Sequence, residues 1–194
     1  MADFTGVSLF DMINGGVLVR ESIPGRLAAF ADLGGATLTT QVMLSVAMPC
    51  LAGDVVSKIA FRSGATAAGT PTNYWFALYD PNGALVAQTA DQLTAAWAAS
   101  TTKDLSLVQF NVSGSAVQSY VLQSTGVYYA AVMVKATTVP SLVGVSQFDA
   151  AFSGGLVTGQ KQIAQTSGAA LTTTAPATIA TPTAVVNRAY AVMH

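Results

Sequence analysis

The sequence predicts an all-β fold, a β-sandwich or jelly roll of about eight strands with an extended N-terminal arm. Apolar and polar residues alternate along several short segments, turn residues separate those segments, and few stretches have helical periodicity. Hydrophobic residues make up 52% of the chain but aromatic residues only 8%, so small and β-branched side chains must fill much of the core. Such side chains suit two sheets packed face to face.

The first 36 residues differ from the rest of the chain. Glycine pairs and a Pro-Gly turn divide them into apolar pieces that are too short to fold alone. These pieces are also too apolar to remain in water as a disordered chain. We therefore expect residues 1–36 to be a docking arm that packs against a neighbouring subunit or a larger particle through Phe4, Phe10, Ile13 and Leu18.

A period of two begins at residue 37. Residues 37–48 have apolar side chains at most even positions, and 55–63 continue the alternation, which predicts two strands with one face in water. Further strands are expected at 105–112, 118–122, 126–134, 141–148 and 184–193.

The strongest local signal is a hairpin at residues 74–87. An aromatic segment, 74–79, is followed by Asp80-Pro81-Asn82-Gly83 and a short apolar segment. Pro81 presets the backbone for a turn, whereas Asn82 and Gly83 tolerate the left-handed conformation that reverses a hairpin.

Two stretches are not predicted to be regular strands. Residues 91–99 are rich in alanine, so they form either a short helix or an irregular crossover that carries Trp97 into the core. Residues from about 154 to 183 form an excursion rich in Thr, Ala, Gly and Pro. The sandwich domain is therefore expected to span 37–194, with this excursion before its last strand.

Charge is scarce in this chain. Only 9% of residues are Asp, Glu, Lys or Arg, against about 25% in a typical soluble domain. Such a surface is poorly protected against association, and we expect neighbouring molecules to cover much of it. Glycosylation, an uncharged polar surface and membrane association are the competing explanations.

Two of the possible environments are disfavoured. The longest apolar run, residues 127–134, falls far short of the ~20 residues needed to cross a bilayer, so no membrane insertion is expected. The Lys and Arg residues are scattered and form no basic stripe for nucleic acid. The N-terminus lacks the pattern of a signal peptide, which predicts synthesis in the cytoplasm.

The residue types needed for catalysis are largely absent. The single histidine, His194, is the last residue, where a side chain is rarely held in place. Asp54, Asp80 and Asp104 stand beside strand boundaries, where aspartate usually caps or turns the chain, although paired carboxylates would suit a small hydrolase. Cys50 lies in an apolar stretch and is expected to be a buried small hydrophobe. We expect no enzymatic activity, cofactor or metal.

The aromatic run suggests one candidate binding face. Alternation places Tyr74 and Phe76 on one side of the strand and Trp75 and Tyr79 on the other. One side must be core. The side with Trp75 and Tyr79 could face a glycan, a partner subunit or the second layer of a buried interface.

Two segments carry a resemblance to a known family. The stretch GDVVSKIAFRSGATAAGTPTNYWFALYDPNGALVAQTAD and the later STGVYYAAVMVKATTVPSLVG resemble the β-sandwich domain of structural proteins of tailed actinobacteriophages, among minor tail, fibre and capsid-decoration proteins. The resemblance covers residues 37–150 and the closing strand, and it includes no catalytic residues. It implies a virion component, often a trimer, displayed on the particle.

Together these observations predict a bacteriophage structural protein of the virion, a capsid-decoration or minor tail protein. Its expected partners are copies of itself, as a homotrimer, and the major capsid or tail proteins of the same particle. The alternative is a receptor-binding or glycan-binding module that attaches the particle to a glycan on the host cell surface.

Overall fold

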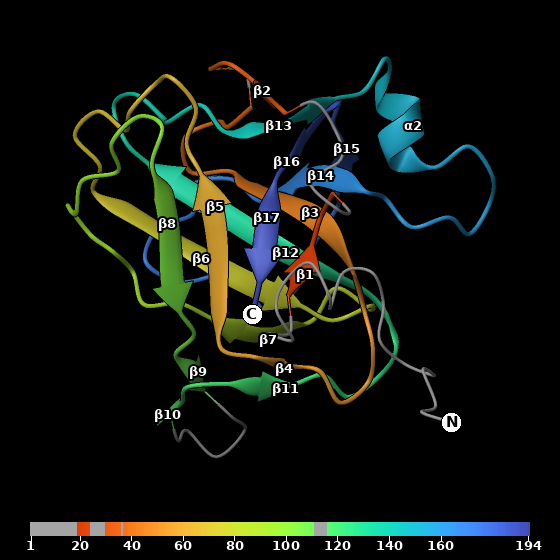
Figure 1. The fold of residues 1–194 in the computed structure, drawn as a ribbon. Coiled ribbons are helices and arrows are strands. Elements are labelled where there is room, and N and C mark those ends of the chain that lie inside the picture. The colour runs from red at the N-terminus through yellow and green to blue at the C-terminus, as the bar shows by residue number, and fades with distance from the viewer. Residues whose placement is uncertain (1–18, 24–29, 36, 111–115) are drawn as a thin grey trace, which may run out of the picture.

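The computed structural model describes residues 19–23, 30–35, 37–110 and 116–194. The fold is nearly all β, as predicted, but it has more strands than eight (Figure 1). The described strands are β1 (Arg20–Glu21), β2 (Ala31–Asp32), β3 (Met43–Cys50), β4 (Val55–Val56), β5 (Lys58–Arg62), β6 (Asn73–Tyr79), β7 (Leu85–Gln88), β8 (Thr102–Ser106), β9 (Gln109–Phe110), β10 (Ala116–Val117), β11 (Tyr120–Val121), β12 (Gly126–Lys135), β13 (Val143–Ser146), β14 (Ala164–Ser167), β15 (Thr183–Ala184), β16 (Asn187–Ala189) and β17 (Ala191–Met193).

Two antiparallel sheets form the body. A six-stranded sheet in the order β15-β14-β3-β12-β6-β7 lies behind a four-stranded sheet in the order β1-β17-β5-β8 in the view of Figure 1. Smaller pairings close the ends: β16-β13-β2 at one end and β4-β11 at the other. The arrangement is a sandwich, and its main core contains Leu44, Val46, Met48, Ile59, Phe61, Tyr74, Phe76, Leu78, Tyr128, Ala130, Val132, Ala191 and Met193.

The predicted last strand is divided between sheets. β16 pairs with β13, whereas β17 pairs with β5 in the four-stranded sheet. Tyr190 lies between them and donates its backbone N–H to Val143. Strands of two or three residues are too short to show an alternation of apolar and polar side chains, which explains why the sequence predicts too few strands.

The first long strand begins later than expected, at Met43 rather than at residue 37. Gln41 has a φ of 63°, in the left-handed region that a strand does not use. The backbone N–H of Val42 donates to Thr39 in a turn. Residues 37–42 therefore alternate in polarity but lead into the strand as a turn.

The hairpin at Asp80-Pro81-Asn82-Gly83 is confirmed. Asp80 and Ala84 are joined by a backbone hydrogen bond of 2.9 Å, and Gly83 has a φ of 79°. The Asp80 carboxylate accepts hydrogen bonds from the backbone N–H groups of Asn82 and Ala84, each at 2.8 Å. Asp80 is thus a turn residue in this structure.

Residues 91–99 form the irregular crossover. They contain no described helix, and Trp97 is buried in the main core. The Trp97 ring lies 5.6 Å from the rings of Tyr74 and Phe76, and its indole N–H donates to the carbonyl of Thr101.

Part of the predicted arm belongs to the body of its own chain. β1 pairs with β17, and β2 pairs with β13. Ser22 is buried, and its hydroxyl bridges Ala189 and Ala191 through two hydrogen bonds of 2.9 Å. β1 and β2, which precede residue 37, are therefore paired with strands of the sandwich. The predicted anchor residues Phe4, Phe10, Ile13 and Leu18 lie outside the described residues.

Candidate interaction surfaces

The second face of the six-stranded sheet is covered by the chain itself. Its side chains form a second core that includes Trp75, Tyr79 and Met133, with Leu171 and Ile179 packed against it. We call residues 171–179 the strap. The strap belongs to the predicted Thr/Ala/Gly/Pro excursion and contains no strand itself, although the same excursion also supplies β14 to the six-stranded sheet.

Trp75 and Tyr79, the candidate binding pair, lie under the strap and have no exposed surface. The indole N–H of Trp75 donates to the carbonyl of Thr172 at 2.8 Å, and the Tyr79 hydroxyl donates to the carbonyl of Pro176 at 2.9 Å. Burial raises the pKa of the Tyr79 hydroxyl. Of the three alternatives for this face, the structure shows a buried layer, and it offers no open aromatic face to a glycan or partner.

Backbone hydrogen bonds hold the strap in place. Leu171 donates to Gln41, Leu85 donates to Ala177 and Ile179 donates to Gly83. Such contacts depend on main-chain atoms and leave little trace in the sequence, so the cover over Trp75 could not be predicted from residue types.

His194 is fixed, unlike most terminal residues. Its Nε2 lies 3.0 Å from Asp104, whose other oxygen accepts from the Lys58 ammonium at 3.2 Å. The His194 carbonyl accepts the backbone N–H groups of Ser57 and Lys58. In the described part of the chain no hydroxyl group hydrogen-bonds to the imidazole ring, so the contacts fasten the C-terminus to a sheet.

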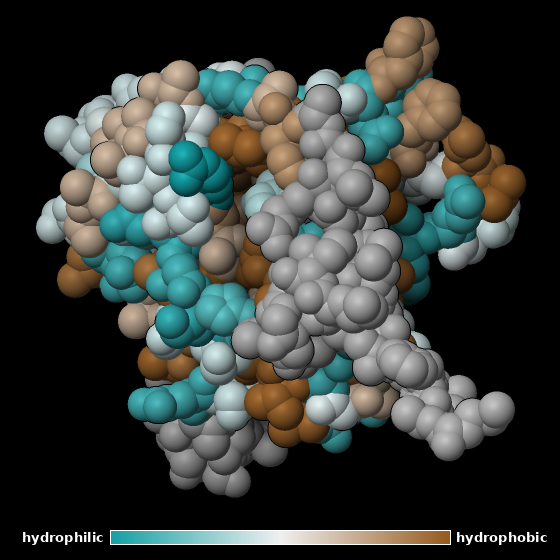
Figure 2. All heavy atoms as spheres, viewed as in Figure 1, coloured by the Kyte–Doolittle hydropathy of each residue, from teal (hydrophilic) through white to brown (hydrophobic). Residues whose placement is uncertain are grey.

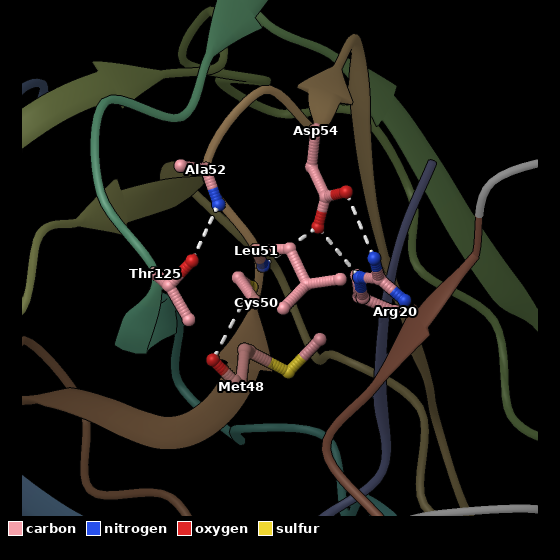
Figure 3. Close-up of polar contacts among 7 residues, drawn as sticks. All are labelled: Arg20, Met48, Cys50, Leu51, Ala52, Asp54 and Thr125. Atoms are coloured by element: carbon pink, nitrogen blue, oxygen red, sulfur yellow. Dashed lines mark hydrogen bonds and ion pairs between the residues drawn. The ribbon is translucent and has the colours of Figure 1, made fainter. Parts of the chain in front are cut away.

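The aspartates considered as possible catalytic acids also make structural hydrogen bonds. Arg20 binds Asp54 through two hydrogen bonds of 2.6 and 2.8 Å, and Asp54 also accepts from the backbone N–H of Leu51 (Figure 3). Asp54, Asp80 and Asp104 thus have three separate sets of partners. Among the described residues there is no group of three His, Cys, Asp or Glu side chains that could hold a metal.

Cys50 is a buried thiol, as expected of a small hydrophobe. Its sulfur donates to the Met48 carbonyl at 3.2 Å (Figure 3). Burial, with a smaller contribution from the Asp54 charge, raises its pKa to about 12. The thiolate needed for nucleophilic chemistry is therefore scarce at neutral pH.

One exposed apolar surface surrounds the only described helix, α2 (Ala150–Gly154). It contains Phe148, which is 96% exposed, together with Phe152, Leu156 and Val157. We call these four residues the α2 knob. Figure 2 shows this hydrophobic projection at the upper right, where Figure 1 places α2.

Local hydrogen bonds shape the α2 knob. The Asp149 carboxylate caps the helix by accepting from Ala151 at 3.0 Å, a common N-cap arrangement. The side-chain oxygen of Gln160 accepts from the backbone N–H groups of Leu156 and Val157. The knob is therefore a formed projection. Sequence analysis missed it because Phe148 fits the alternation of a buried strand, and only the Asp149 cap could have signalled a helix.

A second exposed apolar surface lies on the β4-β11 pairing. Leu51, Val55 and Val121 are 56%, 47% and 47% exposed, and Val55 stands directly opposite Val121 in the register. We call these three residues the β4-β11 patch. It lies at the lower end of the molecule in Figure 1, away from α2.

Comparisons with known proteins match nothing: no family model, curated protein or solved structure resembles this chain closely enough to identify it. Within the described ranges, no helix has the length and apolar character to span a bilayer.

Proposed function

We propose that this protein is a non-enzymatic structural protein of a bacteriophage virion, a capsid-decoration or minor tail protein that assembles with copies of itself on the particle. The observation that carries the proposal is the α2 knob on a chain with very few charges. An apolar projection of this kind usually marks a protein-binding surface.

The energetics favour a partner at the knob. Burying one side chain such as Phe148 stabilises a complex by about 1.5–3 kcal/mol before ordering costs are subtracted. The knob is already shaped by Asp149 and Gln160, so little further ordering opposes binding. Large aromatic side chains are also typical anchors of protein interfaces.

The sparse charge supports the same conclusion. Several described charges are used within the chain, as in the Arg20–Asp54 and Lys58–Asp104 pairs. The surface therefore has few charges left to oppose close packing of subunits, which suits a protein that is covered by neighbours in its working state.

The alternative glycan-binding function has less support. A glycan would need the faces of Trp75 and Tyr79, and the strap covers both. Nothing else among the described residues singles out a sugar site.

The test replaces Phe148 and Phe152 together with serine and measures how much protein purified virions carry, by quantitative immunoblot. We expect the double variant to be strongly depleted from particles. Leu93→Ser is the matched control, because Leu93 is an exposed leucine outside the knob. Equal occupancy of the wild type, the double variant and the control would contradict the proposal.

A further inference from the structure

We infer that the β4-β11 patch is the acceptor site for residues 1–18 of a neighbouring copy of this chain. The inference rests on the proposed function, since it names how the copies are joined. The patch, the point where the chain enters the body, and the composition of residues 1–18 each support it.

The chain enters the body beside the patch. Arg20 is bound to Asp54, the residue immediately before Val55 of the patch (Figure 3). In the antiparallel register Arg20 stands opposite Met193, so the chain before Arg20 is directed toward His194. The carbonyl of His194 is bound by Ser57, which directly follows β4. Val19, the first described residue, therefore lies at the end of the body that carries the patch.

The patch and the segment have matching chemistry. Asp54 is the one charged residue in 51–56 and 120–125, and Arg20 neutralises it through two hydrogen bonds. Residues 1–18 have only Asp3 and Asp11 as charged side chains. Residues 4–10, between these two aspartates, have no charged side chain, so this stretch can cover the patch without burying an unpaired charge, which would be costly.

Length favours a neighbouring copy over the chain's own patch. Eighteen extended residues span roughly 60 Å, whereas strand spacing limits a patch built on two short strands to about 20 Å. Phe4, near the far end of that segment in the sequence, can reach an adjacent subunit. Each copy would give one arm and receive one, a head-to-tail exchange that closes into a ring such as a trimer.

The test is disulfide formation between two populations of the full-length protein. One population carries Ile13→Cys, with Phe10→Cys and Phe4→Cys prepared in parallel, and the other carries Val121→Cys. Cys50 is buried in both and does not compete. A docked arm holds the two thiols at an effective concentration near millimolar. At micromolar protein, we therefore expect cross-linking on the order of 1,000-fold faster than for undocked chains.

Two controls make the result decisive. Leu93→Cys replaces Val121→Cys as an exposed acceptor outside the patch, and a chain with both Ile13→Cys and Val121→Cys tests docking within one molecule. Fast cross-linking between different chains that requires Val121→Cys supports the inference. Cross-linking only within the doubly substituted chain, or no preference for Val121→Cys over Leu93→Cys, overturns it. If the protein is nevertheless oligomeric and particle-bound, the proposed function stands without the arm exchange.

Discussion

Gly83 shows how one residue determines the main hairpin. Its φ of 79° lies in the left-handed region, which a β-branched side chain resists. A Cβ at this position would meet Ile179 at 3.5 Å, an ordinary contact. The cost of substitution therefore comes from the backbone rather than from a clash.

We expect Gly83→Val to lower the free energy of unfolding by about 1 kcal/mol or more. Gly35→Val is the matched control, because a Cβ there meets nothing within 4 Å and no positive φ is found. Denaturant titration of both variants measures the difference. Equal midpoints for the two variants would show that the turn does not restrain the fold.

Because the pKa of the Cys50 thiol is raised, we expect the free energy of unfolding to fall at alkaline pH. Its pKa rises from 9.0 to about 12 in the folded chain, so the neutral thiol stabilises the fold fully below pH 9. This contribution is lost as pH rises from 9 toward 12, because the unfolded chain can release the proton more easily.

Between pH 8 and pH 10.5, the wild type should therefore lose about 2 kcal/mol more stability than Cys50→Ala. Comparing the slopes cancels the effects of Tyr79 and Tyr129, whose pKa values are also raised by burial. Parallel pH profiles for the two proteins would mean that water reaches the Cys50 thiol.

At the scale of elements, β1 contributes to the stability of the sandwich although it precedes the first long strand. β1 adds to the edge of β17, and Arg20 neutralises Asp54, whose side chain is mostly buried. Removal of one partner from such a pair leaves a charge without compensation and costs about 3 kcal/mol or more.

Two truncations test how much β1 and β2 contribute to the stability of the fold. Removal of residues 1–36 should lower the unfolding midpoint well below that of the protein without residues 1–18, because only the longer truncation removes β1 and β2. Thermal unfolding followed by circular dichroism compares the two proteins. A midpoint for the longer truncation equal to that of the shorter one would show that β1 and β2 are dispensable.

The long strands could be predicted from sequence because each has a side that faces the main core. The aromatic segment and the DPNG turn correctly gave the β6-β7 hairpin, and Val127 to Val134 gave most of β12. The strap could not be predicted, since carbonyls of Thr172 and Pro176 bind the aromatic side chains beneath it. Any residue type has such carbonyls.

Alternation of residue types also limits what could be predicted about the candidate surfaces. Alternation assigns Trp75 and Tyr79 to the side opposite the main core, but it cannot say what covers that side. The strand predicted at 141–148 also extends too far, since β13 ends at Ser146 and Phe148 is almost fully exposed beside α2. Short segments such as β1 and β2 lack enough residues for any periodicity to be read.

At the scale of the whole molecule, the chain has two exposed apolar surfaces and little charge. The α2 knob and the β4-β11 patch lie at different ends of the sandwich (Figures 1 and 2). One chain cannot bury one surface against the other. Both surfaces can be covered when copies assemble around a symmetry axis and dock on a particle.

We propose that this protein works as an assembly of copies, and the molar mass of the purified protein in solution tests this proposal. We expect light scattering on the purified full-length protein at micromolar concentration to give about 59 kDa, three times the 19.8 kDa of one chain. A single species at the 19.8 kDa of one chain under the same conditions would contradict the account.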